Sequence, residues 1–594
     1  LHSFPTRRSS DLSKLYTVRK VYLPLCLSVF ACINAQQFKE VMPPAFKNFF
    51  FGRAAIADFN NDGYKDLFFT GTVDENNNNL PDYSFNTFYK NTNGTFSPLQ
   101  SFRENSAYLG DAKFIDFDND GLLDLVATGL SSDEHRTLRW KNTGDAFVLD
   151  NISDGRIRGN IESFDLNHDG LLDYAVNGFQ YKDIGGVNYK TDLYINSKSG
   201  FSDANNETIP LGSLNGKLRI FDINNDGLHD AVIFGTTASG TSEKTFTVYK
   251  NDNGVFNTHQ QLEGLVNGDL AYADFNADGY LDMIACGKDK NNNYHLIYYK
   301  NDSAGKFLKK EISTEYLDNS SLDVGDINDD GYYDFIVIGS GSSASNTTKV
   351  FVYNSSSDTF EYTDYGIPQL GGNGGIKLFD FNNDNKLDIL MYGADNKETD
   401  KPHRTKLLEN TQDITNNAPN PPANLSSSLS DNKILFEWNG ANDDKTPSKA
   451  LQYEFIVGSA PGKSDIAKYT VTTPHWFLQK ENLPNTIYWR VKSIDASKVL
   501  SNDSEEQVVS NLSVNNITKE SNAILYPNPV KDVLNIRTEA KVKSYRIINT
   551  SGQVVLSKTT DEKSINLSGL SKGLYIVEIT FEDAKPLSAK IIIN

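Results

Sequence analysis

Residues 58–66 read DFNNDGYKD, and this nine-residue pattern occurs seven times between Asp58 and Asp388. The other copies are DFDNDGLLD (116–124), DLNHDGLLD (165–173), DINNDGLHD (222–230), DFNADGYLD (274–282), DINDDGYYD (326–334) and DFNNDNKLD (380–388). Successive copies begin 58, 49, 57, 52, 52 and 54 residues apart. A fixed period of this size indicates a repeat architecture such as a propeller, a solenoid or an array.

Each copy places oxygen-bearing side chains at positions 1, 3, 5 and 9 of a tight loop. Calcium takes six to eight oxygen ligands in flexible geometry, so carboxylates at alternate positions can converge on one ion. The glycine at position 6 permits a sharp turn, and the carbonyl at position 7 can be a further ligand. The spacing resembles the first half of an EF-hand loop, but the glutamate at position 12 is missing and strand-like runs flank the loop.

The predicted ligands are the residues at positions 1, 3, 5, 7 and 9 of all seven loops, for up to seven calcium ions. They are Asp58, Asn60, Asp62, Tyr64, Asp66, Asp116, Asp118, Asp120, Leu122, Asp124, Asp165, Asn167, Asp169, Leu171, Asp173, Asp222, Asn224, Asp226, Leu228, Asp230, Asp274, Asn276, Asp278, Tyr280, Asp282, Asp326, Asn328, Asp330, Tyr332, Asp334, Asp380, Asn382, Asp384, Lys386 and Asp388.

A set of Asn, Asp and Gly turns without metal is the alternative interpretation. Such turns do not require Asp at positions 1 and 9 of every copy, and the chain has it there each time. Zinc is disfavoured because no Cys or His recurs at these positions, and magnesium prefers stricter octahedral geometry. In the seventh loop Asn385 replaces Gly and Lys386 adds a positive charge, which predicts weaker binding. His168 and His229 occupy non-ligand positions, and we expect them to be exposed loop residues.

The charge balance supports cation binding. Lys and Arg number 57 and Asp and Glu number 77, which gives a net charge of −20. The ligand positions hold 22 carboxylates, four in the second loop and three in each of the others, and seven calcium ions would reduce the net charge from −20 to −6. We therefore expect calcium to stabilise the fold. A pI of about 4.9 without a basic stripe argues against nucleic-acid binding.

The sequence around each loop predicts four strands. An apolar run ending in Gly follows each loop, as in LFFTG (67–71) and FIVIG (335–339), and such runs suit strands buried on both faces. One short strand precedes the loop, a third resembles FTVYKN (246–251), and a Phe-led strand completes the unit. Four antiparallel strands in a unit of this length are typical of a propeller blade. The predicted fold is all-β, with a seven-bladed β-propeller over residues 36–410.

The seventh unit ends at Asn410 without a fourth strand. We expect the segment QFKEVMPPAF (37–46) to supply that strand and close the ring. Over about residues 38–410 the repeats resemble the FG-GAP or VCBS repeats of integrin α-chain propellers and bacterial surface proteins. That resemblance implies a calcium-binding propeller and does not by itself assign an activity.

The first 35 residues are predicted to lie outside the mature fold. Residues 1–12, LHSFPTRRSSDL, resemble translated sequencing-adaptor sequence. Residues 13–35 have a basic stretch and a 13-residue apolar core, which indicates a signal peptide too short to span a membrane. Cleavage after Ala35 is expected, with a lipoprotein at Cys32 as the alternative. We expect no transmembrane segment in the mature chain, where Cys286 is predicted to be a core residue.

Two small β-sandwich domains are predicted after a linker at 411–422. Residues 419–512 resemble a fibronectin type III domain, with Trp438 and YWRVKSID (488–495) as its core, and a spacer role is expected. Residues 522–594 resemble the type A C-terminal sorting domain of the type IX secretion system. That resemblance implies contact with the secretion machinery and a secreted or outer-membrane surface-attached protein in a Gram-negative bacterium.

The long polar connections between the second and third strands of the units form the candidate ligand face. They are rich in Asn, Ser, Gly, Tyr and Lys, as in residues 72–86 and 287–295, and such loops suit adaptable contacts. No catalytic constellation stands out, and no catalytic residue is assigned. The function expected is adhesion or binding of a glycan or protein ligand. The alternative is a secreted polysaccharide lyase or hydrolase, which needs a charged cleft with a base.

Overall fold

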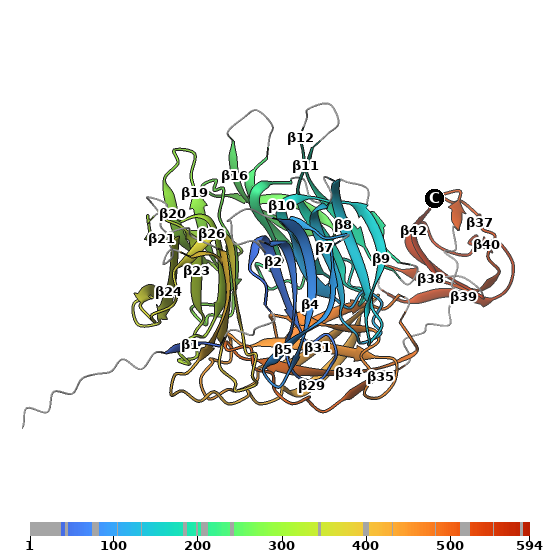
Figure 1. Ribbon diagram of the computed structural model, residues 1–594. Helices are drawn as coiled ribbons and strands as arrows, with labels where there is room; N and C mark the ends of the chain where they lie inside the picture. The colour runs from blue at the N-terminus through green and yellow to red at the C-terminus, as the bar shows by residue number, and fades with distance from the viewer. Residues whose placement is uncertain are drawn as a thin grey trace, which may run out of the picture.

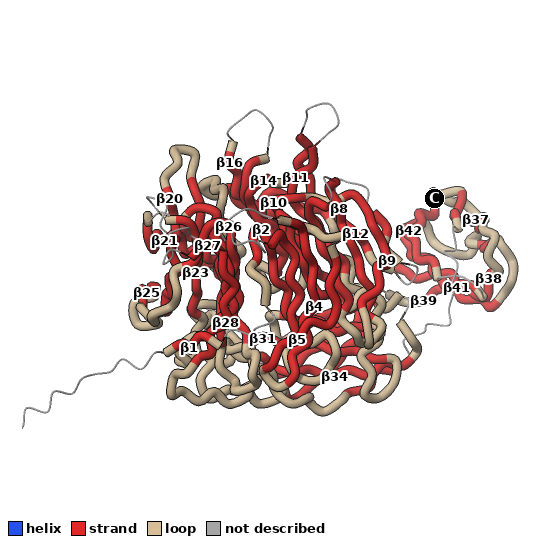
Figure 2. Tube along the Cα trace, in the orientation of Figure 1, coloured by secondary structure: helices blue, strands red, loops and turns tan. Residues whose placement is uncertain are grey.

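The computed structural model describes residues 37–594, except for 42–45, 74–81, 104, 132–133, 182–186, 198–199, 204–211, 238–242, 316, 342–345, 396–402, 431, 482, 511–522, 551 and 583–585. The predicted adaptor segment and signal peptide lie outside the described residues. Strands, loops and turns make up the described chain, and Figure 2 shows no helix in it. Accordingly, the described residues hold no helix long and apolar enough to cross a membrane.

Within the described residues, 38–410 form seven sheets of four antiparallel strands. In six sheets the strands follow chain order. The first three are β2 (Phe49–Ala57), β3 (Asp66–Val73), β4 (Tyr83–Thr92), β5 (Thr95–Phe102); β6 (Tyr108–Ile115), β7 (Asp124–Ser131), β8 (Glu134–Asn142), β9 (Phe147–Asp154); and β10 (Ile157–Phe164), β11 (Asp173–Tyr181), β12 (Val187–Ile195), β13 (Ser202–Asp203). The next three are β14 (Leu214–Phe221), β15 (Asp230–Thr236), β16 (Lys244–Asp252), β17 (Val255–Gln261); β18 (Leu270–Ala273), β19 (Asp282–Lys288), β20 (Tyr294–Asn301), β21 (Phe307–Ser313); and β22 (Asp318–Gly325), β23 (Asp334–Ser340), β24 (Asn346–Asn354), β25 (Thr359–Thr363).

The second strand of each sheet is the most deeply buried. Every residue of β3 is buried, and in β19 only the last residue is partly exposed. Strands packed on both faces need continuous apolar side chains, which is why these runs read LFFTG rather than an alternating pattern. Cys286 lies in β19 with no exposed surface, as the sequence predicts.

The seventh sheet closes the ring with the N-terminal strand. Its order is β26 (Leu370–Phe379), β27 (Asp388–Asp395), β28 (His403–Asn410) and β1 (Phe38–Glu40), with Phe38 opposite Asn410. The first strands of neighbouring sheets contact one another in order, and β26 contacts β2. Figure 1 shows the resulting propeller-like ring of upright sheets. Residues 38–40 thus supply the fourth strand expected from the sequence, whereas 42–45 lie outside the described residues.

Phe38 makes the closing strand a testable part of the core. Its ring is 2% exposed and meets Tyr365 edge-on, with ring centroids 5.8 Å apart. We expect Phe38→Ala to lower the free energy of unfolding by about 3–5 kcal/mol, because it removes a buried aromatic side chain. Denaturant unfolding of the full chain measures this, and Lys39→Ala, an exposed change in the same strand, is the matched control. Equal midpoints for the two variants would contradict closure by this strand.

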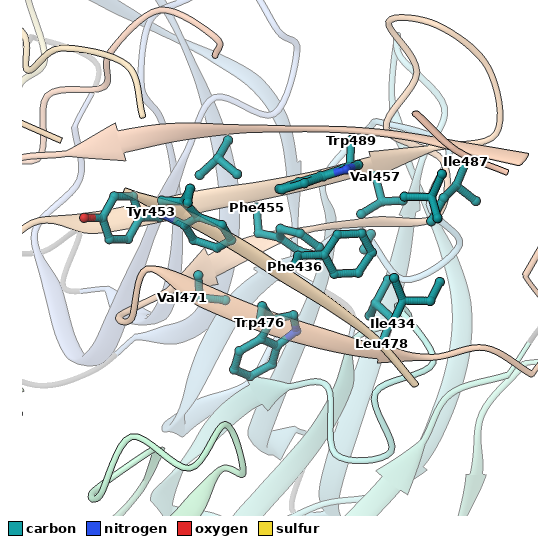
Figure 3. Close-up of a cluster of buried hydrophobic side chains, with 14 of the residues drawn as sticks. Ile434, Phe436, Tyr453, Phe455, Val457, Val471, Trp476, Leu478, Ile487 and Trp489 are labelled. Carbon is teal, nitrogen blue, oxygen red and sulfur yellow. The ribbon is translucent and has the colours of Figure 1, made fainter. Parts of the chain in front are cut away.

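Residues 423–510 form a β-sandwich of two sheets. One sheet has β29 (Ala423–Ser430), β30 (Lys433–Asn439) and β33 (His475–Gln479); the other has β32 (Ala467–Val471), β31 (Gln452–Gly458), β34 (Thr486–Ile494) and β35 (Gln507–Ser510). Figure 3 shows Phe436, Phe455 and Trp489 packed together between the sheets. Trp438 and Trp489 belong to this core, as the sequence predicts.

The C-terminal residues form a second pair of sheets around their own core. These are β36 (Ile524–Tyr526), β37 (Val533–Arg537) and β40 (Ser564–Asn566), and β39 (Val554–Thr559), β38 (Val542–Asn549), β41 (Gly573–Phe581) and β42 (Leu587–Ile593). Leu534, Ile547, Val577 and Ile591 are fully buried between them. In Figure 1 this domain lies to one side of the ring.

The first sandwich packs directly on the ring. Its strands β31 and β34 lie beneath the sheets in Figure 1, at the ends that carry the aspartate loops. The backbone N–H of Asp326 donates to the carbonyl of Ala496 at 2.9 Å, and Ala450 and Ala496 join a core cluster of the ring. The domain therefore covers part of the loop face, a contact that the spacer role expected from the sequence did not include.

Candidate metal centres

The first carboxylate of every loop organises the turn. In the first loop Asp58 accepts hydrogen bonds from the backbone N–H groups of Asp62 at 3.0 Å and Gly63 at 2.9 Å. The equivalent pair of bonds occurs in the other six loops. In the first loop the N–H of Asp62 also reaches Asn60 Oδ1 at 2.9 Å. Positions 1, 3 and 5 thus turn their oxygens toward the inside of one loop.

Two positions of the loop adopt left-handed backbone. Gly63 has φ 90°, and Asn385 takes the same place in the seventh loop with φ 64°, as its tolerance of that conformation predicts. Position 4 is also left-handed in every copy, from φ 54° at Asn119 to 61° at Asp329, and the repeat pattern alone does not predict this. The Asn61 side chain donates to the carbonyl of Gly121 at 2.9 Å, and Asn383 donates to Gly63 at 3.0 Å. The loops therefore brace one another around the ring.

The aspartate at position 9 has no exposed surface in any of the seven loops. Asp230 accepts from the backbone N–H of Ile223 at 2.9 Å and of Asn251, in the third strand, at 2.7 Å. The corresponding Asn91 side chain donates to the carbonyl of Phe381 at 2.7 Å, which ties the first repeat to the last. Position 9 is therefore a structural residue as well as a candidate ligand.

Burial makes the loop carboxylates poor anions without a counter-charge. Burial is the main reason why the pKa of Asp66 is raised to about 7 and that of Asp124 to about 8, and neighbouring loop aspartates contribute to both shifts. Desolvation and like charge both disfavour the ionised form. Lysines compensate in part, since Lys250 lies 3.2 Å from Asp226. A divalent cation within the loop would supply the missing attraction.

The donor set fits a hard cation. Carboxylate oxygens of Asp116, Asp118 and Asp120 lie within 4.8 Å of one another, as do those of Asp380, Asp384 and Asp388, so both groups could hold a metal ion. Asn224 Oδ1, at position 3 of the fourth loop, is buried without a hydrogen-bond partner in the described chain. Loops that offer only oxygen atoms suit calcium rather than zinc.

Two features of the metal candidates were not visible in the sequence. Lys386 turns its Nζ to the carbonyl of Gln412 at 2.9 Å, so its charge contacts the linker. A further acidic group, Glu263, Asp289 and His295, also brings its ligand atoms within 4.8 Å. Asp289 and His295 lie at the hairpin between β19 and β20, whereas Glu263 follows β17 of the preceding sheet. The three residues follow no repeated spacing, so the sequence does not indicate that they meet.

The sandwich covers several of the loops. In the third loop the hydroxyl of Tyr469 donates to Asp165 Oδ2 at 2.9 Å. His168 stacks on Phe477 with ring centroids 3.9 Å apart. In the sixth loop Lys445 Nζ lies 2.7 Å from Asp329 Oδ2.

The expectation that both loop histidines are exposed was wrong. His168 is 2% exposed and His229 is half-buried, because the aromatic side chains of the sandwich lie against them. Burial lowers the pKa of His168 to about 3 and that of His229 to about 4. Both are therefore neutral packing residues of the interface near neutral pH.

Tyr469 provides a test of this interface. We expect Tyr469→Phe to lower the free energy of unfolding by about 1.5–3 kcal/mol. It removes the hydrogen bond to the buried Asp165 carboxylate and the one that the hydroxyl accepts from the Trp476 indole N–H. Tyr488→Phe is the control, since no hydrogen bond of its hydroxyl is found in the described part of the sandwich. Thermal unfolding of the full chain, with calcium present, compares the two. If Tyr469→Phe behaves like its control, the contact contributes nothing to docking.

Comparison with known families divides the chain into two recognisable parts. Residues 58–127 and 274–337 match the FG-GAP-like repeat, and residues 524–594 match the secretion system C-terminal sorting domain. The ring thus carries FG-GAP-like repeats of the integrin α type, and the last domain is a type IX sorting domain. The protein is exported through that secretion machinery and is secreted or surface-attached in a Gram-negative bacterium.

Individual relatives share only part of the chain. Beta-agarase D of Zobellia galactanivorans is 40% identical over 70 residues, which is 12% of this chain and 14% of the agarase. The T-cell immunomodulatory protein of Mus musculus is 28% identical over 148 residues, 21% of this chain and 24% of that protein. A fucose-recognising lectin of Aleuria aurantia with a six-bladed β-propeller fold has 8% identity and a TM-score of 0.33, covering 54% of this chain and 99% of the lectin.

Proposed function

We propose that the ring is a seven-bladed β-propeller whose aspartate loops bind calcium, one ion per blade, through the predicted ligand residues. The ions are structural. They offset the repulsion and desolvation of the carboxylates buried at the strand ends, and calcium outside the cell is plentiful enough to fill sites of modest affinity. Export by type IX secretion delivers the propeller to that environment.

The position of the first sandwich on the loop face indicates which face of the ring can bind a ligand. Asp165 is buried beneath Tyr469, and Asp326 lies against Ala496, so a large ligand cannot reach these loops. The opposite face, where the second strands end and the third strands begin, is the surface that the sandwich leaves uncovered. We assign ligand binding to that face.

The proposed role is adhesion to, or capture of, a glycan or an extracellular protein. The connections on this face are polar and long, and the described one, 288–294, carries Asp289 held by the amides of Asn291 and Asn293 at 2.8 Å each. Parts of the others, at 74–81, 182–186, 238–242, 342–345 and 396–402, lie outside the described residues. Polar loops on a rigid scaffold are the usual carriers of recognition.

Binding is tested with the full chain in calcium against arrays of polysaccharides and extracellular proteins. The proposal expects retention of at least one ligand class, and its loss when loops of the uncovered face are replaced by Gly-Ser linkers. Retention that instead follows changes on the sandwich would overturn the assignment of the face. Cleavage of a retained polysaccharide into shorter products would identify the lyase or hydrolase alternative.

A further inference from the structure

A cavity opens at the centre of the uncovered face. It has a volume of about 80 Å³ and is lined at the ends of the first strands, away from the aspartate loops. Each of the seven sheets contributes one residue with left-handed backbone, with φ between 47° at Phe51 and 60° at Asn373. Four of these seven are asparagines. The ring axis therefore ends in a small chamber rimmed by side-chain amides.

The charge of the chamber is opposite to that of the protein. Its described lining residues include three cations, Arg53, Arg158 and Lys217, and no carboxylate. The chain as a whole carries a net charge of −20. A cationic concavity in an acidic protein concentrates anions from solution.

Lys217 is the deepest of the three cations. It is 8% exposed, and its ammonium has no hydrogen-bond or ion-pair partner within the part of the chain that the structure describes. The nearest carboxylates are already engaged: Asp269 accepts from Arg219 at 3.1 Å and from the N–H of Leu322 at 3.2 Å, and Asp111 accepts from the N–H of Ile161 at 3.0 Å. Asp269 and Asp111 attract the ammonium only through space, without a direct hydrogen bond or ion pair, so this buried charge is incompletely compensated.

The electrostatic environment agrees with this geometry. The pKa of Lys217 is lowered to about 8, mainly by burial and in part by the charges of Arg53 and Arg219, while Asp269 and Asp111 act in the opposite direction. An anion placed beside the ammonium would restore its ordinary basicity. The side chain thus has a favourable interaction to gain from an anionic ligand.

The other cations still have donors to offer. Arg53 Nη1 donates to the carbonyl of Gly52 at 2.9 Å, and Arg158 Nη1 donates to Asn215 Oδ1 at 3.3 Å. A guanidinium has five N–H donors in a fork that matches an oxyanion. Both arginines and Lys217 line a space that holds roughly five to eight water molecules. That space accommodates one carboxylate or sulfate group, with the rest of its molecule outside on the rim.

We propose that this chamber binds the oxyanion of an acidic sugar, so that Lys217, Arg53 and Arg158 hold a carboxylate or sulfate group while the rim contacts the sugar ring. The inference rests on the proposed function, because it names the chemical class of ligand for the same face. It distinguishes uronate-containing or sulfated glycans from neutral ones.

The test is a ligand-detected NMR titration of the full, calcium-loaded chain. The probes are sodium glucuronate, glucose as the neutral sugar of the same size, and inorganic sulfate as a competitor. We expect glucuronate to bind, glucose not to bind, and Lys217→Met to weaken glucuronate at least tenfold. Arg158→Gln, an exposed change that leaves the core intact, is expected to weaken it severalfold. Displacement by sulfate would extend the ligand class to sulfated sugars.

Controls separate this inference from the proposed function. Lys309→Met removes a surface charge that is paired with Glu263 at 2.7 Å; Lys309 lies in β21, the fourth strand of its sheet, and does not line the chamber, so this variant is expected to leave glucuronate binding unchanged. Equal binding of glucose and glucuronate, or full binding by folded Lys217→Met, would overturn the inference. Array ligands that still bind Lys217→Met unchanged would keep the proposed function and remove the chamber from it. Glucuronate binding without any array ligand would keep the chamber and remove the adhesion role.

Discussion

Chelation of calcium is expected to lower the free energy of unfolding of the full chain by about 5 kcal/mol or more. A ligand at 100 times its dissociation constant stabilises the folded state by about 2.7 kcal/mol per site. The two loops whose carboxylates converge most closely, at Asp116–Asp120 and Asp380–Asp388, would already give about twice that value. Thermal unfolding in excess calcium, and again after addition of a chelator, measures the difference.

Metal analysis of the dialysed protein decides how many loops contribute. Close to seven calcium ions per chain would establish binding in every repeat, and a smaller number would rank the loops. Magnesium is the matched control ion, because its smaller size and stricter octahedral geometry fit these loops less well. An unchanged melting temperature after chelation, together with no bound calcium, would reduce the loops to hydrogen-bonded turns.

The periodic parts of the molecule were predictable from the sequence. A strand such as β3, buried on both faces, needs a largely apolar run such as its Leu67–Phe69 segment. A loop that repeats Asp at positions 1 and 9 likewise predicts the same turn geometry in each copy. Closure by residues 38–40 was predictable by counting strands, because the last sheet lacked one. Each of these features is local, or follows from a unit that occurs seven times.

The contacts between domains were not predictable. Tyr469 and Asp165 are 304 residues apart, and neither belongs to a pattern that points to the other. From the sequence, His168 is expected to be an exposed polar loop residue, but in the structure Phe477 of the sandwich stacks on it. The central chamber was not predictable for a related reason. Arg53, Arg158 and Lys217 come from three different sheets, and only closure of the ring places them around one cavity.

Asp230→Ala is expected to destabilise the fold strongly whether or not calcium is present. The carboxylate accepts two buried backbone N–H groups, those of Ile223 and Asn251. An unsatisfied buried donor costs about 1–3 kcal/mol, so the loss of both predicts about 2–6 kcal/mol in the chelated protein. Calcium binding at this loop would be lost as well, which adds to the difference in the calcium-loaded protein.

Asp226→Ala separates the two contributions. It removes a carboxylate from the same loop, but Asp226 is exposed and its partners include the side chains of Asn224 and Lys250 at the surface. We expect this variant to match the wild type within about 1 kcal/mol in chelator, since surface ion pairs contribute little, and to fall below it only in calcium. Denaturant unfolding of both variants, in calcium and in chelator, gives four free-energy differences from the wild type. If Asp230→Ala matched Asp226→Ala in chelator, the position 9 aspartates would be ligands alone, and the loops would have no framework independent of the metal.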